Sequence, residues 1–429
     1  MSGSDTSRYD VVVCGAGVAG LATARAMSEL GLRVLVVDKQ HRPRPVAKGE
    51  VLQPGALRVL RRWGTARALE RRNAVRLGRL VVRGPAGEAL MALDYGRLPE
   101  GDRSLVAHDH LTILDALSED LGPRVELRRG VLVEEALRDS AGRVIGVLLA
   151  QENRRSTVHA DLVVAADGIA SRLRRAAGID GRRLDYPHRL LSFEITGAAW
   201  RPEDFSAYLT ARGLRLAYPL PGGRVRLYAQ VTPEELRGLD SAQLAAWASE
   251  MLRGTPALEP LAGPLRESLP TRQILPVFRL LTPRLSVPGL ALVGESAYAV
   301  HPMAAQGMNT AITSADCLSG LLAEHLDRSG ALSPGVVDGA LRDYERRQVP
   351  ALAHTARTSD NAARMVTDLS WRGRLLGRRA VRHTGANPRL LRAVTYNMAG
   401  LGPVRLTPLD RLHQIGLLPD PRAHRVPDA

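Results

Sequence analysis

Gly15, Gly17 and Gly20 have the spacing of a loop that holds a pyrophosphate between a strand and a helix. Gly15 allows the tight turn, Gly17 lets the backbone approach the phosphates, and Gly20 lets the helix pack close to the sheet. Asp38, 23 residues after Gly15, ends a second apolar strand, where its carboxylate can accept both ribose hydroxyls of an adenosine. A strand-helix-strand unit that needed glycines only for packing would not explain this acid. The pattern therefore predicts a dinucleotide site.

Two later stretches also end a buried strand on a glycine beside an acid. In residues 160–179 the strand runs into Asp167-Gly168, and a helix follows. In residues 290–322 the strand ends in the letters VGE, and a loop, HPMAA, leads into a long helix that begins QGMN.

Together these three stretches resemble the single-component FAD-dependent monooxygenases, the aromatic hydroxylases of the para-hydroxybenzoate hydroxylase class. The resemblance covers roughly residues 9–330. Residues 48–64, KGEVLQPGALRVLRRWG, and more weakly residues 396–419, are similar to the squalene epoxidase and ubiquinone-pathway hydroxylase branch.

The resemblance implies noncovalent FAD and a set of residues around it. NAD(P)H would serve as a transient reductant that binds in a groove, since no second GxGxxG unit is present. Asp167 would lie between FAD and the approaching nicotinamide. The implied cofactor residues are Gly15, Gly17, Val18, Ala19, Gly20, Asp38, Lys39, Arg44, Lys48, His110, Asp167, Gly168, Glu295, Pro302, Gly307, Met308 and Asn309.

The chain departs from the family pattern at several of these positions. Glu295 stands where the family usually has an Asp that reaches the ribityl chain, and His110 stands where an FAD-binding arginine is common. Lys48 or Arg44 would fill a second arginine position near the pyrophosphate. Lys48 could instead be an ordinary exposed lysine, and His110 a structural helix residue.

The loop at residues 301–305, which we call the flavin loop, also departs from the family pattern. Ala304 and Ala305 replace the usual glycines, which narrows the space over the flavin and costs backbone freedom. His301 in the same loop is a candidate for acid–base work, or it caps the loop.

The order of strand and helix patterns predicts an α/β fold with interleaved domains. We expect a Rossmann-like FAD-binding domain interleaved with a β-sheet substrate domain and followed by a helical C-terminal tail. In residues 224–231, RVRLYAQV, apolar and polar side chains alternate, as in a strand with one face on a core. The predicted divisions are 1–80, 105–185 and 283–345 for the FAD-binding domain, 81–104 and 186–282 for the substrate domain, and 346–429 for the tail.

The resemblance implies a reaction with NAD(P)H and O₂ through a flavin C4a-hydroperoxide, which hydroxylates or epoxidises a hydrophobic small molecule. A polyketide, a quinone or quinolone, and a terpenoid or polyene are the substrates considered, with a role in secondary metabolism. The residues expected to act on the reaction are Asp167, His301, Tyr218 and Tyr228; Gln230, Tyr298 and Met303 are further candidates for the pocket wall. A flavin-bound enzyme that catalyses a non-redox cyclisation or isomerisation in the same pocket is the alternative.

Composition limits the partners. The net charge is +15, but 57 of the 59 basic residues are arginines spread along the chain, and no nucleic-acid-binding motif accompanies them. We therefore expect no specific nucleic-acid partner. No run of about 18 apolar residues occurs, and the N-terminus is polar, which predicts a cytoplasmic protein without a transmembrane segment. The basic tail, residues 372–429, leaves open a weak membrane-surface contact. Two cysteines are too few for a disulfide framework or a metal cluster, and no metal is predicted.

Overall fold

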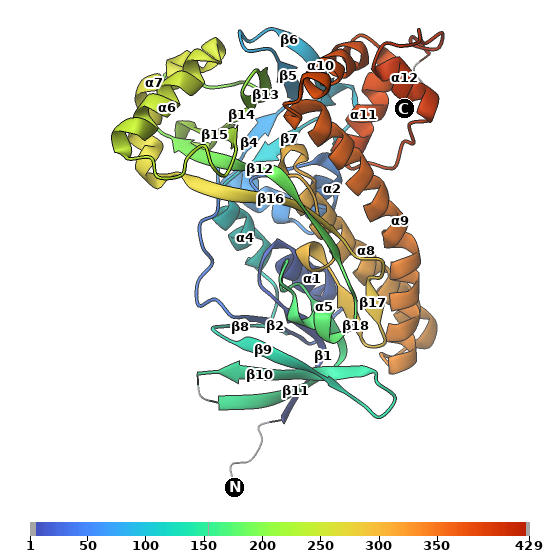
Figure 1. The fold of residues 1–429 in the computed structure, drawn as a ribbon. Helices are drawn as coiled ribbons and strands as arrows, with labels where there is room; N and C mark the ends of the chain where they lie inside the picture. The colour runs from blue at the N-terminus through green and yellow to red at the C-terminus, as the bar shows by residue number, and fades with distance from the viewer. Residues whose placement is uncertain (1–5, 153, 426–429) are drawn as a thin grey trace.

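The computed structural model describes residues 6–152 and 154–425 and confirms the predicted α/β fold. Two large sheets lie one above the other, with helices between and beside them (Figure 1). The first sheet has the order β17-β18-β11-β1-β2-β8, in which β18, β11, β1, β2 and β8 are parallel. Its strands are β1 Thr6–Cys14, β2 Val34–Asp38, β8 Val125–Arg129, β9 Leu132–Arg138, β10 Val144–Gln151, β11 Arg154–Ala165, β17 Ser286–Val287 and β18 Leu290–Leu292.

Helices cover the first sheet because its strands are apolar on both faces, as parallel strands usually are. Residues 11–13 and 34–37 are almost completely buried. The helices beside them are α1 Val18–Ser28, α4 His110–Ser118, α5 Arg172–Ala176 and α8 Gln306–Ser329. The amino ends of α1 and α8 both follow loops at the carboxyl edge of this sheet, which is where ligands bind in such folds.

The second sheet has the order β19-β16-β12-β15-β14-β13-β5-β6. Its strands are β5 Arg79–Arg83, β6 Ala89–Asp94, β12 Arg182–Ile195, β13 Phe205–Thr210, β14 Gly213–Leu220, β15 Arg224–Val231, β16 Gln273–Leu281 and β19 Tyr298–Ala299. The predicted alternation in β15 is confirmed, because Val225, Leu227, Ala229 and Val231 pack in one core with residues of α6 Ser241–Arg253 and α7 Ala262–Ser268. The opposite face of β15 is turned toward the first sheet.

A third, small sheet is separate from the two large ones. It consists of β3 Val51–Leu52, β4 Val75–Leu77 and β7 Leu105–Ala107, and the helices α2 Pro54–Arg62 and α3 Thr65–Arg71 follow β3. The segment before β3, residues 46–50, therefore passes between the two large sheets.

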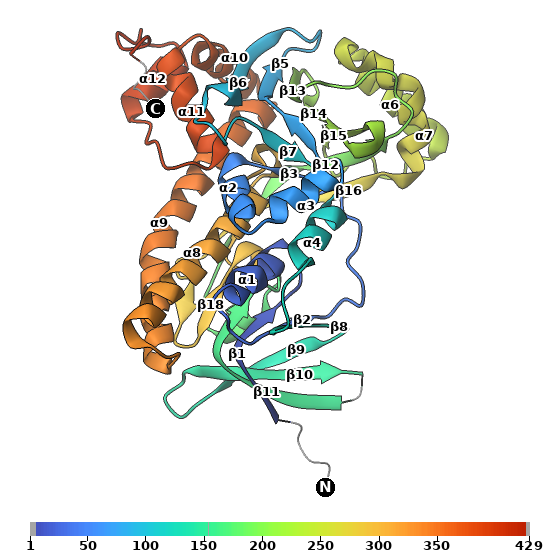
Figure 2. The same cartoon turned by 180° about the vertical axis from the view of Figure 1, so that it is seen from behind.

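The C-terminal region is helical, as predicted. It contains α9 Pro334–Thr367, α10 Trp371–Gly385, α11 Pro388–Ala399 and α12 Pro408–Gln414. Helix α9 runs from the first sheet to the second along one side of the molecule, and α10, α11 and α12 gather at the far end (Figures 1 and 2). The predicted domain divisions stay predictions. The division at residue 345 falls within α9, and the one at residue 185 falls within β12. Among the helices of residues 6–152 and 154–425, none is both long and apolar enough to cross a membrane.

Candidate active site

The three glycines of the first loop are required for different reasons. Gly15 has φ +110°, and a Cβ on it would overlap the carbonyl oxygen of Ala166. A Cβ on Gly20 would overlap the carbonyl oxygen of Gly15. A Cβ on Gly17 would meet no atom of the chain within 4 Å. The fold therefore needs Gly15 and Gly20, whereas the open space at Gly17 is left for something other than the protein.

Asp38 lies beside this loop. Its Oδ2 accepts a hydrogen bond from the Ala16 N–H at 2.7 Å, and its Oδ1 accepts one from Gln40 N–H, also at 2.7 Å. Each oxygen keeps a lone pair for a further donor, such as a ribose hydroxyl. Lys39 and Arg44 are exposed close by and form no ion pair with any residue that the structure describes.

A cavity of about 330 Å³ lies between the two large sheets. Of the residues predicted to hold the cofactor, it is lined by Gly17, Val18, Ala19, Lys48, His110, Gly168, Glu295, Pro302, Gly307 and Met308. Its other wall comes from the second sheet and consists of Leu190, Phe205, Leu216, Tyr218, Tyr228 and Leu275. The cavity thus joins a glycine-rich, polar half to an apolar half.

The start of α8 points backbone N–H groups at the cavity. Gly307 and Met308 line it from the first helical turn, where N–H groups have no partner within the helix. The side chain of Asn309 turns away instead: its Oδ1 accepts from the Ala56 N–H at 2.7 Å, and its Nδ2 donates to Gln306. Asn309 therefore fixes the helix start against α2.

Lys48 and Glu295 form an ion pair at 2.5 Å across the rim of the cavity. The two side chains are 45% and 36% exposed, and pairs of this kind contribute about 0–1 kcal/mol. Little free energy is therefore lost if a ligand separates them. His110 faces the same rim, with Nδ1 3.3 Å from the Gly49 carbonyl. Burial lowers its pKa, so a neutral imidazole, without the charge of the family's arginine, stands at this position at neutral pH.

Asp167 caps a helix. Its Oδ2 accepts from the Arg172 N–H at 2.8 Å and from the Leu173 N–H at 3.4 Å, at the start of α5. Its Oδ1 is buried and has no partner among the described residues. One oxygen thus serves the fold, and the other is available to a ligand.

We predict that Asp167→Ala and Asp167→Asn will separate these two roles. Loss of the cap in Asp167→Ala should lower the free energy of unfolding by about 1 kcal/mol, whereas Asp167→Asn keeps an oxygen acceptor and should not. Both variants should slow anaerobic flavin reduction by NAD(P)H about tenfold, the scale of one lost charge-assisted hydrogen bond. Urea unfolding and stopped-flow absorbance measure the two effects. If Asp167→Asn reduces its flavin at the native rate, Asp167 is only a cap.

His301 does not reach the cavity. It is completely buried, its Nδ1 accepts from the Met303 N–H at 3.1 Å, and its Nε2 lies 2.9 Å from Nε2 of His188. Because Nδ1 is an acceptor, neutral His301 carries its proton on Nε2 and donates it to His188. Burial lowers the pKa of His301 to about 3 and that of His188 to about 4. His301 therefore acts as a loop cap, the second of the two roles considered for it, and acid–base work at this residue is not supported.

This histidine pair predicts a loss of stability in acid. The unfolded imidazoles have a pKa of about 6.5. As the pH falls below 6.5, the unfolded chain takes up protons that the folded chain does not, so the free energy of unfolding decreases until the folded pKa values are reached. Between pH 6.5 and 5 the loss should be about 2 kcal/mol for one imidazole and at most about 4 kcal/mol for two. Urea unfolding at both pH values should show a smaller acid loss in His188→Asn; an equal loss would contradict the assignment.

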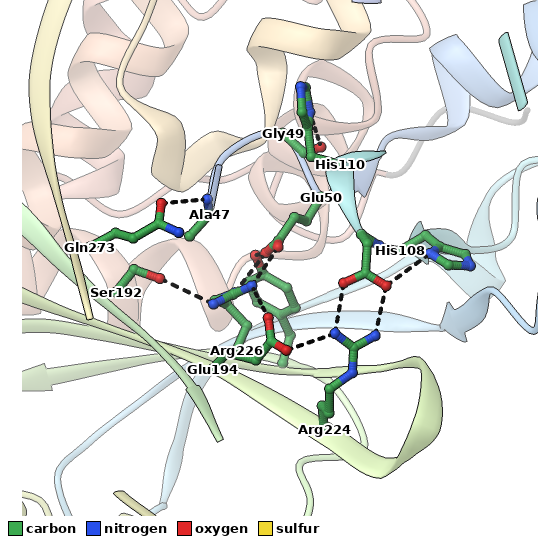
Figure 3. Close-up of polar contacts among 12 residues, drawn as sticks. Ala47, Gly49, Glu50, His108, His110, Ser192, Glu194, Arg224, Arg226 and Gln273 are labelled. Atoms are coloured by element: carbon green, nitrogen blue, oxygen red, sulfur yellow. Dashed lines mark hydrogen bonds and ion pairs between the residues drawn. The ribbon is translucent and has the colours of Figure 1, made fainter. Parts of the chain in front are cut away.

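A buried polar network links the 46–50 segment to the second sheet (Figure 3). Glu50 Oε2 accepts from Arg226 Nε at 2.9 Å, and Oε1 accepts from Arg226 Nη2 at 2.7 Å. Both side chains are almost completely buried. Burial opposes the charge of Arg226, but the Glu50 carboxylate holds its pKa above the ordinary value. Glu194, which is partly exposed, also contacts Arg226 at 2.9 Å and links it to Arg224. This network ties the 46–50 segment to β15 and β12.

Two tyrosines complete the network at the cavity wall. Tyr218 donates to Glu50 Oε2 at 2.8 Å, and Tyr228 donates to the Ala47 carbonyl at 2.7 Å. Their hydroxyl oxygens are 3.3 Å apart. Since both protons are committed, each oxygen can offer a bound molecule only a lone pair. Burial raises the pKa of both hydroxyls, which keeps them protonated.

Three of the residues proposed for the pocket wall lie elsewhere. Gln230 accepts from the Leu214 N–H and donates to the Thr367 carbonyl. Tyr298 is buried and is not among the residues that line this cavity, and Met303 lines a different cavity. Conversely, the sequence interpretation missed Glu50 and Phe205. Glu50 stood inside the quoted segment KGEVLQPG, and an acid just before two apolar residues was the one signal for it.

Three observations fit FAD: the open space at Gly17, the unpartnered Asp167 Oδ1, and the first-turn N–H groups of α8 at the cavity wall. No group of three or more His, Cys, Asp or Glu side chains suited to a metal ion occurs in the described part of the chain.

Comparison with known proteins agrees with this site. The sequence model of the FAD binding domain family matches residues 8–336. The chain belongs to this family, and it is an FAD-dependent monooxygenase, an oxidoreductase.

The chain is also similar to individual proteins of known sequence or structure. The chain is 29% identical over 330 residues to 6-methylpretetramide 4-monooxygenase of Streptomyces rimosus, covering 76% of this chain and 78% of that one. It is 25% identical to squalene monooxygenase of Mus musculus, over 71% of this chain and 53% of that protein. Among solved structures it is similar to pqsL, a probable FAD-dependent monooxygenase of Pseudomonas aeruginosa, with a TM-score of 0.73, 25% identity, and coverage of 84% of this chain and 97% of that one.

Proposed function

We propose that this monooxygenase uses NAD(P)H and O₂ to hydroxylate or epoxidise an apolar small molecule in the cavity between the two sheets. The observation that carries the proposal is the apolar wall of Leu190, Phe205, Leu216 and Leu275, directly opposite the predicted FAD residues. A wall of this kind binds an organic molecule through burial of apolar surface.

Different residues of the chain would bind the cofactor, the nicotinamide and the substrate. Gly17, Asp38 and the α8 start would hold the cofactor, while Asp167 would face the approaching nicotinamide. The bound flavin supplies two-electron transfer and the activation of O₂. The apolar wall would orient the substrate and keep bulk water out, which protects reactive oxygen species from wasteful decay.

We further propose a polycyclic aromatic substrate of polyketide type that carries a hydroxyl, in secondary metabolism. Two observations support this choice over a quinone, quinolone, terpenoid or polyene. The Streptomyces relative acts, by its name, on 6-methylpretetramide. In addition, Tyr218 and Tyr228 offer only lone pairs at the wall, which suits a substrate O–H donor.

The test is turnover by purified, FAD-loaded protein. With 6-methylpretetramide as the probe, NAD(P)H oxidation and O₂ consumption should rise together in a ratio near one. Anthracene, which has no hydroxyl, is the matched probe and should stimulate both less. Product formed without O₂ and without NAD(P)H would support the non-redox alternative instead.

The two alanines of the flavin loop should limit the wasteful release of hydrogen peroxide. Ala305 has φ +50°, a left-handed conformation that costs a non-glycine residue about 1–2 kcal/mol, and Ala304 is completely buried. Glycine at both positions should remove the free-energy cost of the left-handed conformation but loosen the packing over the cavity. We expect about a twofold rise in hydrogen peroxide released per NAD(P)H, since a looser pocket admits water. A peroxide assay during turnover measures it; an unchanged yield would show that these alanines do not protect the reaction.

We also propose a weak contact with an anionic membrane surface, through α10 and the segment after α12. Trp371, Leu375 and Leu376 are exposed on α10 beside exposed arginines, and Leu417 and Leu418 are exposed next to α12. Apolar and basic side chains on one helix suit such a surface. Flotation with phosphatidylglycerol vesicles, but not phosphatidylcholine vesicles, should carry the native protein and not a Trp371→Ser, Leu375→Ser, Leu376→Ser variant. The cytoplasmic location stays a prediction.

A further inference from the structure

A second cavity, of about 440 Å³, lies between the edge of the second sheet and the C-terminal helices. Strands β5 and β6 form one wall, and α9, α10, α11 and residues 404–414 form the others. It shares no described lining residue with the cavity that holds the predicted FAD residues. Met303 lines it, whereas its neighbour Pro302 lines the other cavity, so the flavin loop separates the two.

The interior of the second cavity is apolar and adaptable. Leu80, Val82 and Leu93 line it from the sheet. Four of the eight methionines of the chain also line it: Met91, Met303, Met365 and Met398. Methionine side chains are flexible and polarisable, and they accommodate apolar molecules of varied shape. A cavity of this size and lining is suited to an apolar organic molecule.

The polar part of the lining is positively charged. It includes Arg357, Arg405 and Arg411, and no Asp or Glu among the described lining residues. The side chains of Arg357 and Arg405 form no hydrogen bond or ion pair with a residue that the structure describes, and the guanidinium of Arg411 donates to Gln414 Oε1 at 2.7 Å. Burial lowers the pKa of Arg411, and the nearby Asp410 carboxylate only partly opposes this shift.

The acids nearby do not neutralise these arginines. Asp410, adjacent in sequence to Arg411, is buried and bound to Arg389 at 2.5 Å, and Asp360 on α9 is bound to Arg279 at 2.8 Å. Nε2 of His354 forms a hydrogen bond with Oδ1 of Asn397 at 3.1 Å. The three guanidinium groups thus remain available for an anion, which arginine binds through charge-assisted, often bidentate hydrogen bonds.

We propose that this cavity is a second ligand site, which binds an amphipathic organic anion. Its apolar body lies among the methionines, and its carboxylate or phosphate lies at Arg357, Arg405 and Arg411. The proposal does not depend on the identity of the oxidised substrate. The anion is either the acidic end of a long substrate that reaches past Met303, or a separate ligand such as a fatty acid.

The experiment uses FAD-loaded protein and three probes with the same chain: dodecanoate, dodecyl phosphate and dodecanol. Calorimetry should show binding of the two anions and at least about tenfold weaker binding of dodecanol, the scale of one or two charge-assisted hydrogen bonds. The double variant Arg357→Gln with Arg405→Gln should raise the dissociation constants of the two anions at least about tenfold. Val394→Trp, which fills the cavity, should weaken the binding of all three probes.

The matched control is Arg378→Gln with Arg382→Gln, which removes two exposed charges from α10 outside the cavity and should leave binding unchanged. Flavin absorbance distinguishes the two sources of the anion: a change on dodecanoate binding indicates a chain that reaches the reaction cavity, and no change indicates a separate ligand. The proposal is overturned if no anion binds, or if binding is equal for dodecanol and insensitive to the Arg357, Arg405 and Val394 variants.

Discussion

A Gly17→Val variant should fold as the native chain does and fail to hold FAD. A Cβ at residue 17 meets no atom of the protein, and the residue has ordinary extended backbone angles, φ −81° and ψ −173°. The new side chain should instead occupy the space that a pyrophosphate needs. We expect the dissociation constant for FAD to rise at least about 100-fold, or about 3 kcal/mol. Flavin fluorescence titration of the apoprotein measures it.

Two comparisons make this prediction specific. Gly320→Val places the same side chain on an exposed position of α8 that also has open space, and it should bind FAD normally. Gly20→Val should fail to fold, since its Cβ would overlap the Gly15 carbonyl. If Gly17→Val binds FAD with native affinity, the cofactor does not cross this loop as proposed.

Loss of Glu50 should strongly lower the free energy of unfolding. Glu50→Leu leaves Arg226 buried without its main partner, and breaking a buried pair in this way costs about 3–5 kcal/mol. It also removes the acceptor of the Tyr218 hydroxyl. Urea unfolding of the apoprotein measures the change.

A double-variant cycle tests whether the unpaired charge is the cause. Glu50→Leu with Arg226→Met should be less destabilised than Glu50→Leu alone, because no charge remains buried. Glu194→Leu, which removes the partly exposed partner of the same arginine, should cost less than about 1 kcal/mol. A double variant as unstable as Glu50→Leu would contradict the charge argument.

The parts of the fold that depend on local pattern could be predicted from the sequence. The strand before Gly15, the helix after Gln306 and the alternation in residues 224–231 each follow from periodicity and glycine placement within a few residues. The position of Asp167 at a strand end is of the same kind. Its role as the cap of α5 could not be predicted, because that depends on the path of the backbone after Gly168.

The rest of the site depends on contacts between distant segments. Glu50 meets Arg226 across 176 residues of chain, and His188 meets His301 across 113. No local pattern marks such pairs, so the sequence does not reveal that His301 is buried against His188 and lies outside the cavity. The second cavity was missed for the same reason, since its lining comes from strands near residue 80 and from helices after residue 350.

We infer that this chain transfers an oxygen atom from O₂ to a substrate bound beside FAD. The most direct test is mass spectrometry of the product formed under ¹⁸O₂ in ordinary water, with FAD-loaded protein, NAD(P)H and 6-methylpretetramide. We expect one ¹⁸O atom in each product molecule and no product in Gly17→Val. Product without ¹⁸O, or product formed in the absence of oxygen, would contradict it.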